Sequence, residues 1–480
     1  MLKKYFISNI QIMLLLNVLV KPIWIFFIDR NVQILVGHNQ YGLYNALLSL
    51  TIIFNIVLDF GITNYNNKTI AEDNTRIKKS LPNLIIAKSL LSFLYFGIVF
   101  LVAVAFQYDE HALKLLGLLA IVQFFNSFLQ FLRSNISANH DFQLDGILSV
   151  LDKIIMIFIC GFLLHSTTYK NQFVIEWMIY AQIIAYLIAI IVALFIIVKK
   201  YTSIQFNHFS FKEMIDLCKK SVPYAVLILF MAIYMRSDSL MLERLCSAAQ
   251  NGLYANANRM LDVANMLGFL FAGILLPMFA RLISNKGNLN EIIVTSANII
   301  IPISLGLVAF SFIYSQEIMV LLYEDHSEVL TWIFRIVMAS FPAYCIMYIY
   351  STLLTANGNI KLLIAIALAG SLLSIGLNSL LIIKYQALGA AITAVFVEWI
   401  LALAYIFYCI RKFSLPIQLK WVLKFVLYFI FMLGINMALK NYTDSLIIST
   451  SINAVAFVGL VYGLKFWDKK ILIGYFKSNS

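Results

Sequence analysis

Charged side chains placed inside long apolar runs are the residues of this sequence that could do chemistry. Lys21, Arg236 and Arg335 each have apolar neighbours on both sides. A charge at the centre of a membrane helix costs at least about 2.5–3.5 kcal/mol on insertion scales, so each residue is a candidate for a functional site. Arginine forks onto phosphate oxygens, and the pattern therefore predicts a cationic cavity for a phosphorylated or otherwise anionic ligand. Ion pairs that only stabilise the fold are the competing interpretation.

Further charged residues fall in the same kind of run. Lys153 follows Asp152, and it either lines the cavity or extends its ammonium to the polar edge of the membrane. Lys88 lies near the start of its run, where an anchor at the membrane surface explains it equally well. Arg259 and Asp262 are three residues apart and are predicted to pair on one helix face. The other acidic residues singled out inside the runs are Asp59, Asp238 and Glu398.

Membrane-spanning helices must position these side chains, because 62% of the residues are hydrophobic and only 12% are charged. About fourteen apolar runs have the length of about 20 residues that crosses a hydrocarbon core of about 30 Å. The sequence therefore predicts an all-α polytopic membrane protein without a soluble domain. The predicted spans are 9–28, 43–63, 83–106, 115–134, 146–165, 177–198, 221–242, 255–280, 292–314, 329–354, 361–383, 387–410, 421–439 and 446–465.

The distribution of basic residues predicts the orientation of these spans. With the N-terminus in the cytoplasm, 23 of the 35 Lys and Arg residues fall in cytoplasmic segments and 6 in outer segments. Basic loops stay on the cytoplasmic side during insertion, so both termini are predicted to be cytoplasmic. The net charge of +12 is then explained by contact with anionic lipid, and no nucleic-acid partner is expected. The apolar run in 1–28 lacks a small-residue cleavage site and is interpreted as a retained first helix.

An internal repeat indicates two related halves. The segment QYGLY begins at Gln40 and QNGLY begins at Gln250, and each copy opens the second span of its half. Six spans separate the copies, so the halves are predicted to be parallel, a transporter plan that places the substrate site between them. Chance similarity in an apolar chain is the alternative interpretation.

The predicted domains follow from this repeat. They are an N-terminal six-helix bundle over 1–198, a cytoplasmic amphipathic linker over 199–220, a C-terminal six-helix bundle over 221–412, and two additional helices with a cytoplasmic tail over 413–480. A central cavity is expected between the two bundles.

Signatures of enzymes and metal sites are missing from the sequence. There is no P-loop, no HExxH and no Gly-x-Ser-x-Gly motif. The five cysteines and six histidines have no ligand spacing. We therefore predict no catalytic residue, no metal and no cofactor. An acidic group near His326, formed by Glu324, Asp325 and Glu328, is interpreted as a solvated loop rather than a metal site for glycosyl transfer.

Several segments resemble one known family of membrane proteins. They include LDFGITNYNNKTIA from Leu58, MRSDSLMLERLCSAAQNGLYANANRM from Met235, LLPMFARL from Leu275 and LNSLLIIKYQALGAAITAVFVEW from Leu377. These segments are similar to the polysaccharide and oligosaccharide flippases, of the O-antigen (Wzx) type, in the multidrug/oligosaccharidyl-lipid/polysaccharide exporter superfamily. The sequence departs from the family where a proline commonly precedes the glycine at position 389.

The resemblance implies a function and a place in the cell. It implies translocation of a polyprenyl-pyrophosphate-linked oligosaccharide across the bacterial inner membrane for O-antigen and lipopolysaccharide, capsule or exopolysaccharide biosynthesis, by alternating access of a V-shaped cavity. Expected partners are this lipid-linked substrate, membrane lipids and other polysaccharide-assembly proteins. The residues assigned to the cavity are Lys21, Lys153, Arg236 and Arg335. Those assigned to coupling with an ion or proton gradient are Asp59, Asp238 and Glu398.

Two other functions stay open at this point. A small-molecule or multidrug antiporter of the same superfamily would share the fold, but it should prefer cationic substrates and an acidic cavity. A membrane glycosyltransferase or polymerase should carry a large outer loop with catalytic groups, and the loops between the predicted spans are short.

Overall fold

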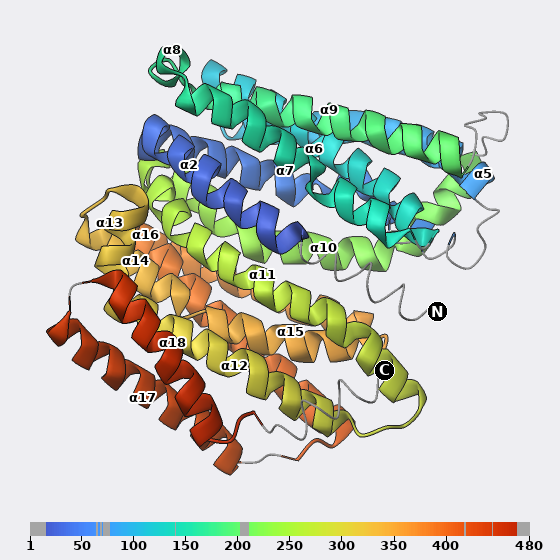
Figure 1. Cartoon of the computed structure of the whole chain (residues 1–480). Helices are drawn as coiled ribbons and strands as arrows, with labels where there is room; N and C mark the ends of the chain where they lie inside the picture. The colour runs from blue at the N-terminus through green and yellow to red at the C-terminus, as the bar shows by residue number, and fades with distance from the viewer. Residues whose placement is uncertain are drawn as a thin grey trace. The chain divides into compact units, whose positions relative to one another are not determined.

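The computed structural model of the chain is built from membrane-length helices (Figure 1). It describes residues 16–63, 66–67, 70, 77–139, 141–201, 211–416, 419–443 and 445–467, and no strand occurs among them. Twelve helices in these ranges are long and apolar enough to cross a membrane. Two of the twelve contain a single non-helical residue, Gly37 in one and Gln386 in the other, which divides each into two consecutive helices. The prediction of an all-α chain with about fourteen membrane helices is therefore confirmed.

The chain forms two compact units. The first contains 1–255 and 367–375, and the second contains 256–366 and 376–480. The helices of the first unit are η1 (Trp24–Asp29, a π-helix), α2 (Arg30–Phe54), α3 (Ile56–Asp59), α5 (Ile77–Ala105), α6 (Glu110–Ala138), α7 (Phe142–His165), α8 (Thr167–Lys170), α9 (Ile175–Lys200), α10 (Phe211–Leu245) and the start of α11 (Ala248–Ser284). Those of the second are α12 (Leu289–Ile313), α13 (Ser315–Tyr323), α14 (Glu328–Met338), α15 (Phe341–Ala356), α17 (Leu419–Tyr442) and α18 (Leu446–Gly463). Helix α16 (Ile360–Phe413) contributes to both units.

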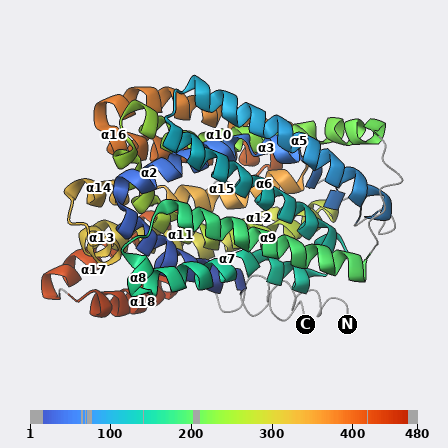
Figure 2. The same cartoon turned by 90° about the horizontal axis from the view of Figure 1, so that it is seen from above.

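Small residues let helices of the first unit approach closely. On α9, Ala185, Ala189 and Ala193 recur every four residues and are fully buried. This spacing places them on one face of the helix, and α9 packs against α6 and α7, as the two ribbon views agree (Figures 1 and 2). A stripe of alanines brings backbones together where lipid supplies no hydrophobic driving force. Helix α9 packs in this way beside α7, which carries Lys153, one of the predicted site residues.

In the second unit, helices α17 and α18 pack on α12 through an aromatic core. Tyr428, Phe466 and Met432 are buried there, and the rings of Phe425 and Phe466 stack with centroids 4.8 Å apart. Tyr314 also donates a hydrogen bond to the carbonyl of Asn436 over 3.5 Å. These contacts fix the two C-terminal helices to the second unit.

The predicted linker lies partly outside the described residues, since 202–210 are not among them. The remainder, from Phe211, is the first part of helix α10, which continues without interruption to Leu245. The predicted amphipathic segment is thus helical where the structure describes it, and it is continuous with the next membrane helix.

A carboxylate at the start of α7 provides a test of pH dependence. Asp141 caps this helix at the Leu144 amide and accepts hydrogen bonds from Lys200 and Tyr201. Burial raises the pKa of the Asp141 carboxyl, but the bonds from Lys200 and Tyr201 outweigh burial and hold the pKa below its usual value. Because its pKa is lower in the folded state, the ionised Asp141 carboxylate contributes to the free energy of unfolding at pH values above the unfolded pKa of about 3.9. This contribution is lost as the pH falls through the folded pKa.

We therefore expect Asp141→Asn to lower the unfolding temperature at pH 7, and the difference from the wild type to narrow as the pH approaches 4 and below. Thermal unfolding in detergent at several pH values measures this. A difference that stays constant with pH would contradict an ionised carboxylate as the stabilising group.

Candidate functional site

Two of the predicted basic residues lie together in the first unit. Lys21 lies within electrostatic range of Lys153, Asp152 and Arg133. Pro22 follows Lys21 and lacks the backbone donor of a regular helix. The chain then forms the π-helix η1, a form that often occurs at functional sites, and η1 packs against α7. This irregular start of the first membrane helix positions Lys21 beside the two charges on α7.

Aromatic rings surround the Lys153 ammonium. It lies 5.4 Å from the centroid of the Trp24 ring and 5.9 Å from that of Tyr186, and 3.2 Å from the Asp152 carboxylate. The side chain is partly exposed, so it is not sealed in the protein. A cation–π site in the membrane can hold the ammonium in place while it remains available to a ligand. Lys21 and Lys153 form a basic pair that Asp152 only partly neutralises.

Arg236 and Asp238 lie on α10, which packs against α2. Asp238 accepts hydrogen bonds from the Tyr254 hydroxyl and, over 2.7 Å, from the Ser239 amide. Arg236 is half-buried and interacts electrostatically with Asp238. No hydrogen bond of its guanidinium is found among the residues that the structure describes. A half-buried guanidinium with free donors is suited to bind an anion.

Asp59, predicted for ion coupling, forms an ion pair with the buried Lys88 that sequence reasoning did not find, and the Asp59 side chain itself is 21% exposed. The Lys88 ammonium is 2.7 Å from its carboxylate, 3.0 Å from the Ser127 hydroxyl and 3.3 Å from the Leu58 carbonyl. Lys88 is 2% exposed, so its three donors are all used inside the protein and it is not a surface anchor. Asp59 also lines a cavity of about 220 Å³ with Asn55 and other polar residues.

The predicted residues of the second unit lie in different surroundings. The Arg335 Nε donates to the Ser315 hydroxyl over 2.6 Å, and the guanidinium lies 4.7 Å from the centroid of the Trp332 ring. Glu398 is buried, and it lies within electrostatic range of Tyr348 and Tyr405. Arg259 and Asp262 pair at 3.3 Å, as their spacing predicts. Among the described residues, no group of His, Cys, Asp and Glu could hold a metal ion.

The two copies of the repeat contact each other, which the sequence alone did not indicate. A Cβ atom on Gly42 would lie 1.7 Å from the carbonyl oxygen of Ala248, and one on Gly252 would lie 2.1 Å from that of His38. Asn251 donates to the Gly42 carbonyl over 2.7 Å. The glycines therefore allow the first turns of two helices to meet backbone to backbone.

The fold defines an all-α polytopic membrane protein with charged residues inside its helical units. The chain is similar to a structure titled lipid II flippase MurJ in an inward closed conformation, with 16% identity and a TM-score of 0.69 over 95% of this chain and 97% of that one. It is also similar to an inward-facing multidrug resistance MATE family transporter of the MOP superfamily, with 15% identity and a TM-score of 0.62 over 80% and 98%. A MOP superfamily transporter from Pyrococcus furiosus, whose title reports reverse polarity of the binding pocket, matches with 15% identity and a TM-score of 0.58 over 86% and 96%. No curated protein matches.

The model of the polysaccharide biosynthesis protein family matches residues 6–283. The chain belongs to this family, and the resemblance found in its sequence is confirmed.

Proposed function

We propose that this chain is a flippase that moves a polyprenyl-pyrophosphate-linked oligosaccharide across the bacterial inner membrane, for O-antigen, capsule or exopolysaccharide biosynthesis. The observation that carries the proposal is the basic pair Lys21 and Lys153 inside a membrane-helix bundle of the polysaccharide biosynthesis protein family. The pyrophosphate is the part of such a substrate that needs cationic partners in a membrane.

The roles follow from the chemistry of each group. Arg236, with free guanidinium donors, binds the pyrophosphate by forked hydrogen bonds, and Lys21 and Lys153 neutralise its charge. Trp24 and Tyr186 are buried, and their rings hold the Lys153 ammonium in place. Arg335 lines a separate pocket together with residues of α17 and has no role in this proposal.

The mechanism that we propose is alternating access of two helical bundles, 1–198 and 221–412. The linker 199–220 and the two C-terminal helices lie outside these bundles in this proposal. Asp238, hydrogen-bonded to Tyr254, and the buried Glu398 are the proposed proton or ion carriers, and Asp59 is the third. Both termini are cytoplasmic in this proposal.

The test is leaflet access of a polyprenyl-pyrophosphate oligosaccharide in proteoliposomes, measured with a membrane-impermeant reagent that modifies sugars. We expect the wild type to expose the inner-leaflet pool with the glycan unaltered. We expect Arg236→Gln and Lys153→Gln each to slow this by about tenfold or more, the effect of one lost charge-assisted hydrogen bond. Lys199→Gln is the matched control, because Lys199 also lies over an aromatic ring, that of Phe195 at 5.5 Å, but at the end of α9.

Full flipping by both variants would exclude Arg236 and Lys153 as parts of the substrate site. An elongated or transferred glycan would move the protein to the glycosyltransferase or polymerase class.

A multidrug antiporter is the second candidate, because MATE family transporters share the fold. Such a protein would export cationic dyes from proteoliposomes and leave the lipid-linked oligosaccharide in place. The basic character of the Lys21 and Lys153 pair disfavours cationic substrates.

A further inference from the structure

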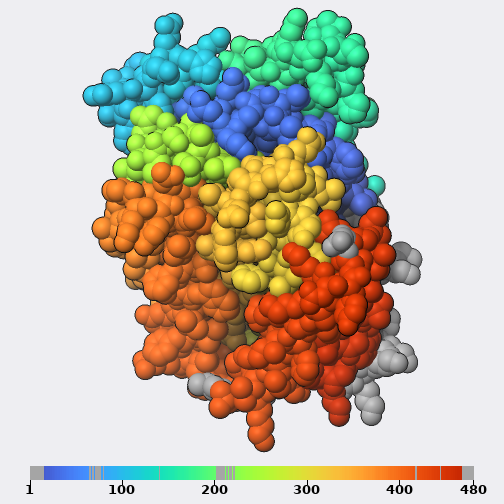
Figure 3. All heavy atoms as spheres, turned by 90° about the vertical axis from the view of Figure 1, so that its left-hand side faces the viewer, coloured from blue at the N-terminus to red at the C-terminus, as the bar shows by residue number. Residues whose placement is uncertain are grey.

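A second basic pocket lies in the second unit, at the ends of three helices. Its volume is about 420 Å³. It is lined by Phe312 and Ile313 at the end of α12, Arg335 on α14, and Met437, Lys440 and Asn441 near the end of α17. Figure 3 shows the face of this unit on which the α13–α14 segment (yellow) borders the C-terminal helices (red). Lys21, Lys153 and Arg236 all belong to the first unit and do not line this pocket.

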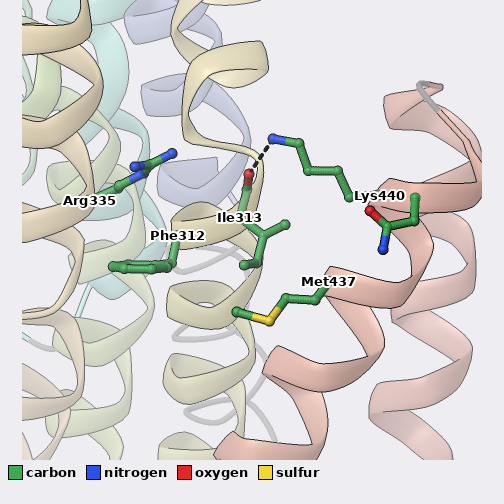
Figure 4. A pocket seen from close by; sticks show the side chains of 6 residues that line it. Phe312, Ile313, Arg335, Met437 and Lys440 are labelled. Atoms are coloured by element: carbon green, nitrogen blue, oxygen red, sulfur yellow. Dashed lines mark hydrogen bonds between the residues drawn. The ribbon is translucent and has the colours of Figure 1, made fainter.

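Two basic side chains from different helices face this pocket. The Lys440 ammonium donates to the Ile313 carbonyl over 2.9 Å (Figure 4). The same ammonium lies 2.9 Å from the Glu317 carboxylate. The Arg335 Nε is bonded to Ser315, and within the described residues its two terminal nitrogens donate to no protein atom. A guanidinium presents those nitrogens as a fork, the geometry that phosphate oxygens match.

The charges of the pocket do not balance. Arg335 and Lys440 contribute two positive charges, and among the residues that the structure describes Glu317 is the one carboxylate paired with them. Lys440 has three donors and uses two. Its side chain is 40% exposed, so the ammonium is open to a ligand. One negative charge would neutralise this site.

Apolar side chains lie beside the basic end of the pocket. In Figure 4, the Phe312 ring and the Met437 side chain lie on one side of the Arg335 and Lys440 head groups. Met437 precedes Lys440 by three residues, so it lies about 4.5 Å farther from the end of α17. Met437 and Trp332 are 53% and 47% exposed. Exposed tryptophan is enriched where membrane helices cross the headgroup region.

We propose that this pocket binds the phosphate of an anionic phospholipid of the surrounding bilayer, whose acyl chains lie along Phe312 and Met437. Arg335 forks onto the phosphate oxygens and Lys440 adds a point charge. The pocket is polar at the helix ends and apolar below, which matches the order of headgroup and chain in a phospholipid. The bound lipid links α17 to α12 and α14, beside the direct Lys440 to Ile313 bond. This lipid is a resident of the protein, distinct from any transported molecule.

The test uses the purified full chain in neutral detergent, with bound lipid counted by native mass spectrometry. Phosphatidylglycerol, phosphatidylcholine and inorganic phosphate are titrated separately. We expect the wild type to retain one phosphatidylglycerol under conditions that remove phosphatidylcholine. Arg335→Gln and Lys440→Gln should each weaken its retention by about tenfold. Glu317→Gln should strengthen it, because Lys440 loses its competing carboxylate.

Arg411→Gln is the matched control, because that guanidinium also lies over an aromatic ring, that of Phe407 at 4.1 Å, near the end of α16. It should leave retention unchanged. Arg335→Lys, which keeps a charge but loses the fork, should give an intermediate value, and monodisperse elution of each variant verifies folding.

Three results would overturn the proposal. The first is equal retention by the wild type, Arg335→Gln and Lys440→Gln. The second is saturation by inorganic phosphate as readily as by the phospholipid. The third is displacement of phosphatidylglycerol from the wild type by a polyprenyl pyrophosphate, which would assign the pocket to that lipid.

Discussion

Replacing Lys88 by methionine should lower the free energy of unfolding by up to about 3–5 kcal/mol, the cost of removing one partner of a fully buried ion pair, because the Asp59 carboxylate that is left behind is 21% exposed. Lys88 is fully enclosed, and its ammonium is 2.7 Å from the Asp59 carboxylate. Methionine fills a similar volume but supplies no donor, so Asp59 and the Ser127 hydroxyl lose the ammonium. Thermal unfolding in detergent or nanodiscs, followed by the intrinsic fluorescence of the tryptophans, measures the shift.

A double-mutant cycle separates the pair from simple packing. Asp59→Asn should restore much of the stability lost in Lys88→Met, because the uncompensated carboxylate is then removed. In the wild-type background Asp59→Asn should be destabilising, since it leaves the Lys88 ammonium buried. Lys199→Met, at the exposed end of α9, is the control and should change stability by less than about 0.5 kcal/mol. Equal effects of Lys88→Met and Lys199→Met would contradict a structural role for the pair.

This pair illustrates which contacts the sequence can predict. Arg259 and Asp262 pair as their spacing predicts, because three residues of helix bring two side chains to one face. Lys88 and Asp59 lie 29 residues apart on two different helices. No period within either helix identifies a partner on another helix, so the sequence could not identify Asp59 as the partner of Lys88.

The helices themselves were predictable because hydrophobicity and length suffice to identify a membrane span. The turns at Gly37 and Gln386 fall between predicted spans, at 29–42 and 384–386. The π-helix η1 was not predicted. The charged residues of the candidate site were identified from the free energy that a charge costs inside a membrane. Which of them lie near one another depends on helix packing, which the sequence does not show. Lys21 and Lys153 lie within electrostatic range of each other, and Arg335 instead shares a pocket with Lys440.

Replacing Gly42 by alanine should prevent the contact between the two repeat copies. The added Cβ would lie 1.7 Å from the Ala248 carbonyl oxygen, far inside van der Waals contact, and the atoms that it meets are backbone. Backbone cannot turn away as a flexible side chain can, so the part of α2 that follows Gly37 must separate from the first turn of α11. The hydrogen bonds from Asn251 to Gly42 and from Asn45 to Ser239, 2.7 and 3.1 Å long, should be lost with it.

Cysteine accessibility measures this separation. In a chain whose native cysteines are replaced, a cysteine introduced at the buried Ser239 should react slowly with a polar maleimide, and Gly42→Ala should raise the rate by about tenfold or more. Gly252→Ala should act in the same way, since its Cβ would meet the His38 carbonyl at 2.1 Å. Gly97→Ala is the matched control: Gly97 is also helical, but nothing lies within 4 Å of its added Cβ, and alanine there should be neutral or slightly stabilising.

If alanine at 42 left the Ser239 position protected and the unfolding temperature unchanged, the close approach of the two copies would not be part of the native packing. If Gly42→Ala exposed position 239 while the protein remained folded, the contact between the two repeat copies would be one that opens and closes in the native protein.

A repeat of four residues in register, each copy at the start of a helix, then has a physical explanation, because both surfaces of a close backbone contact need glycine. The repeat would be retained as one interface, with Gly42 on one side and Gly252 on the other.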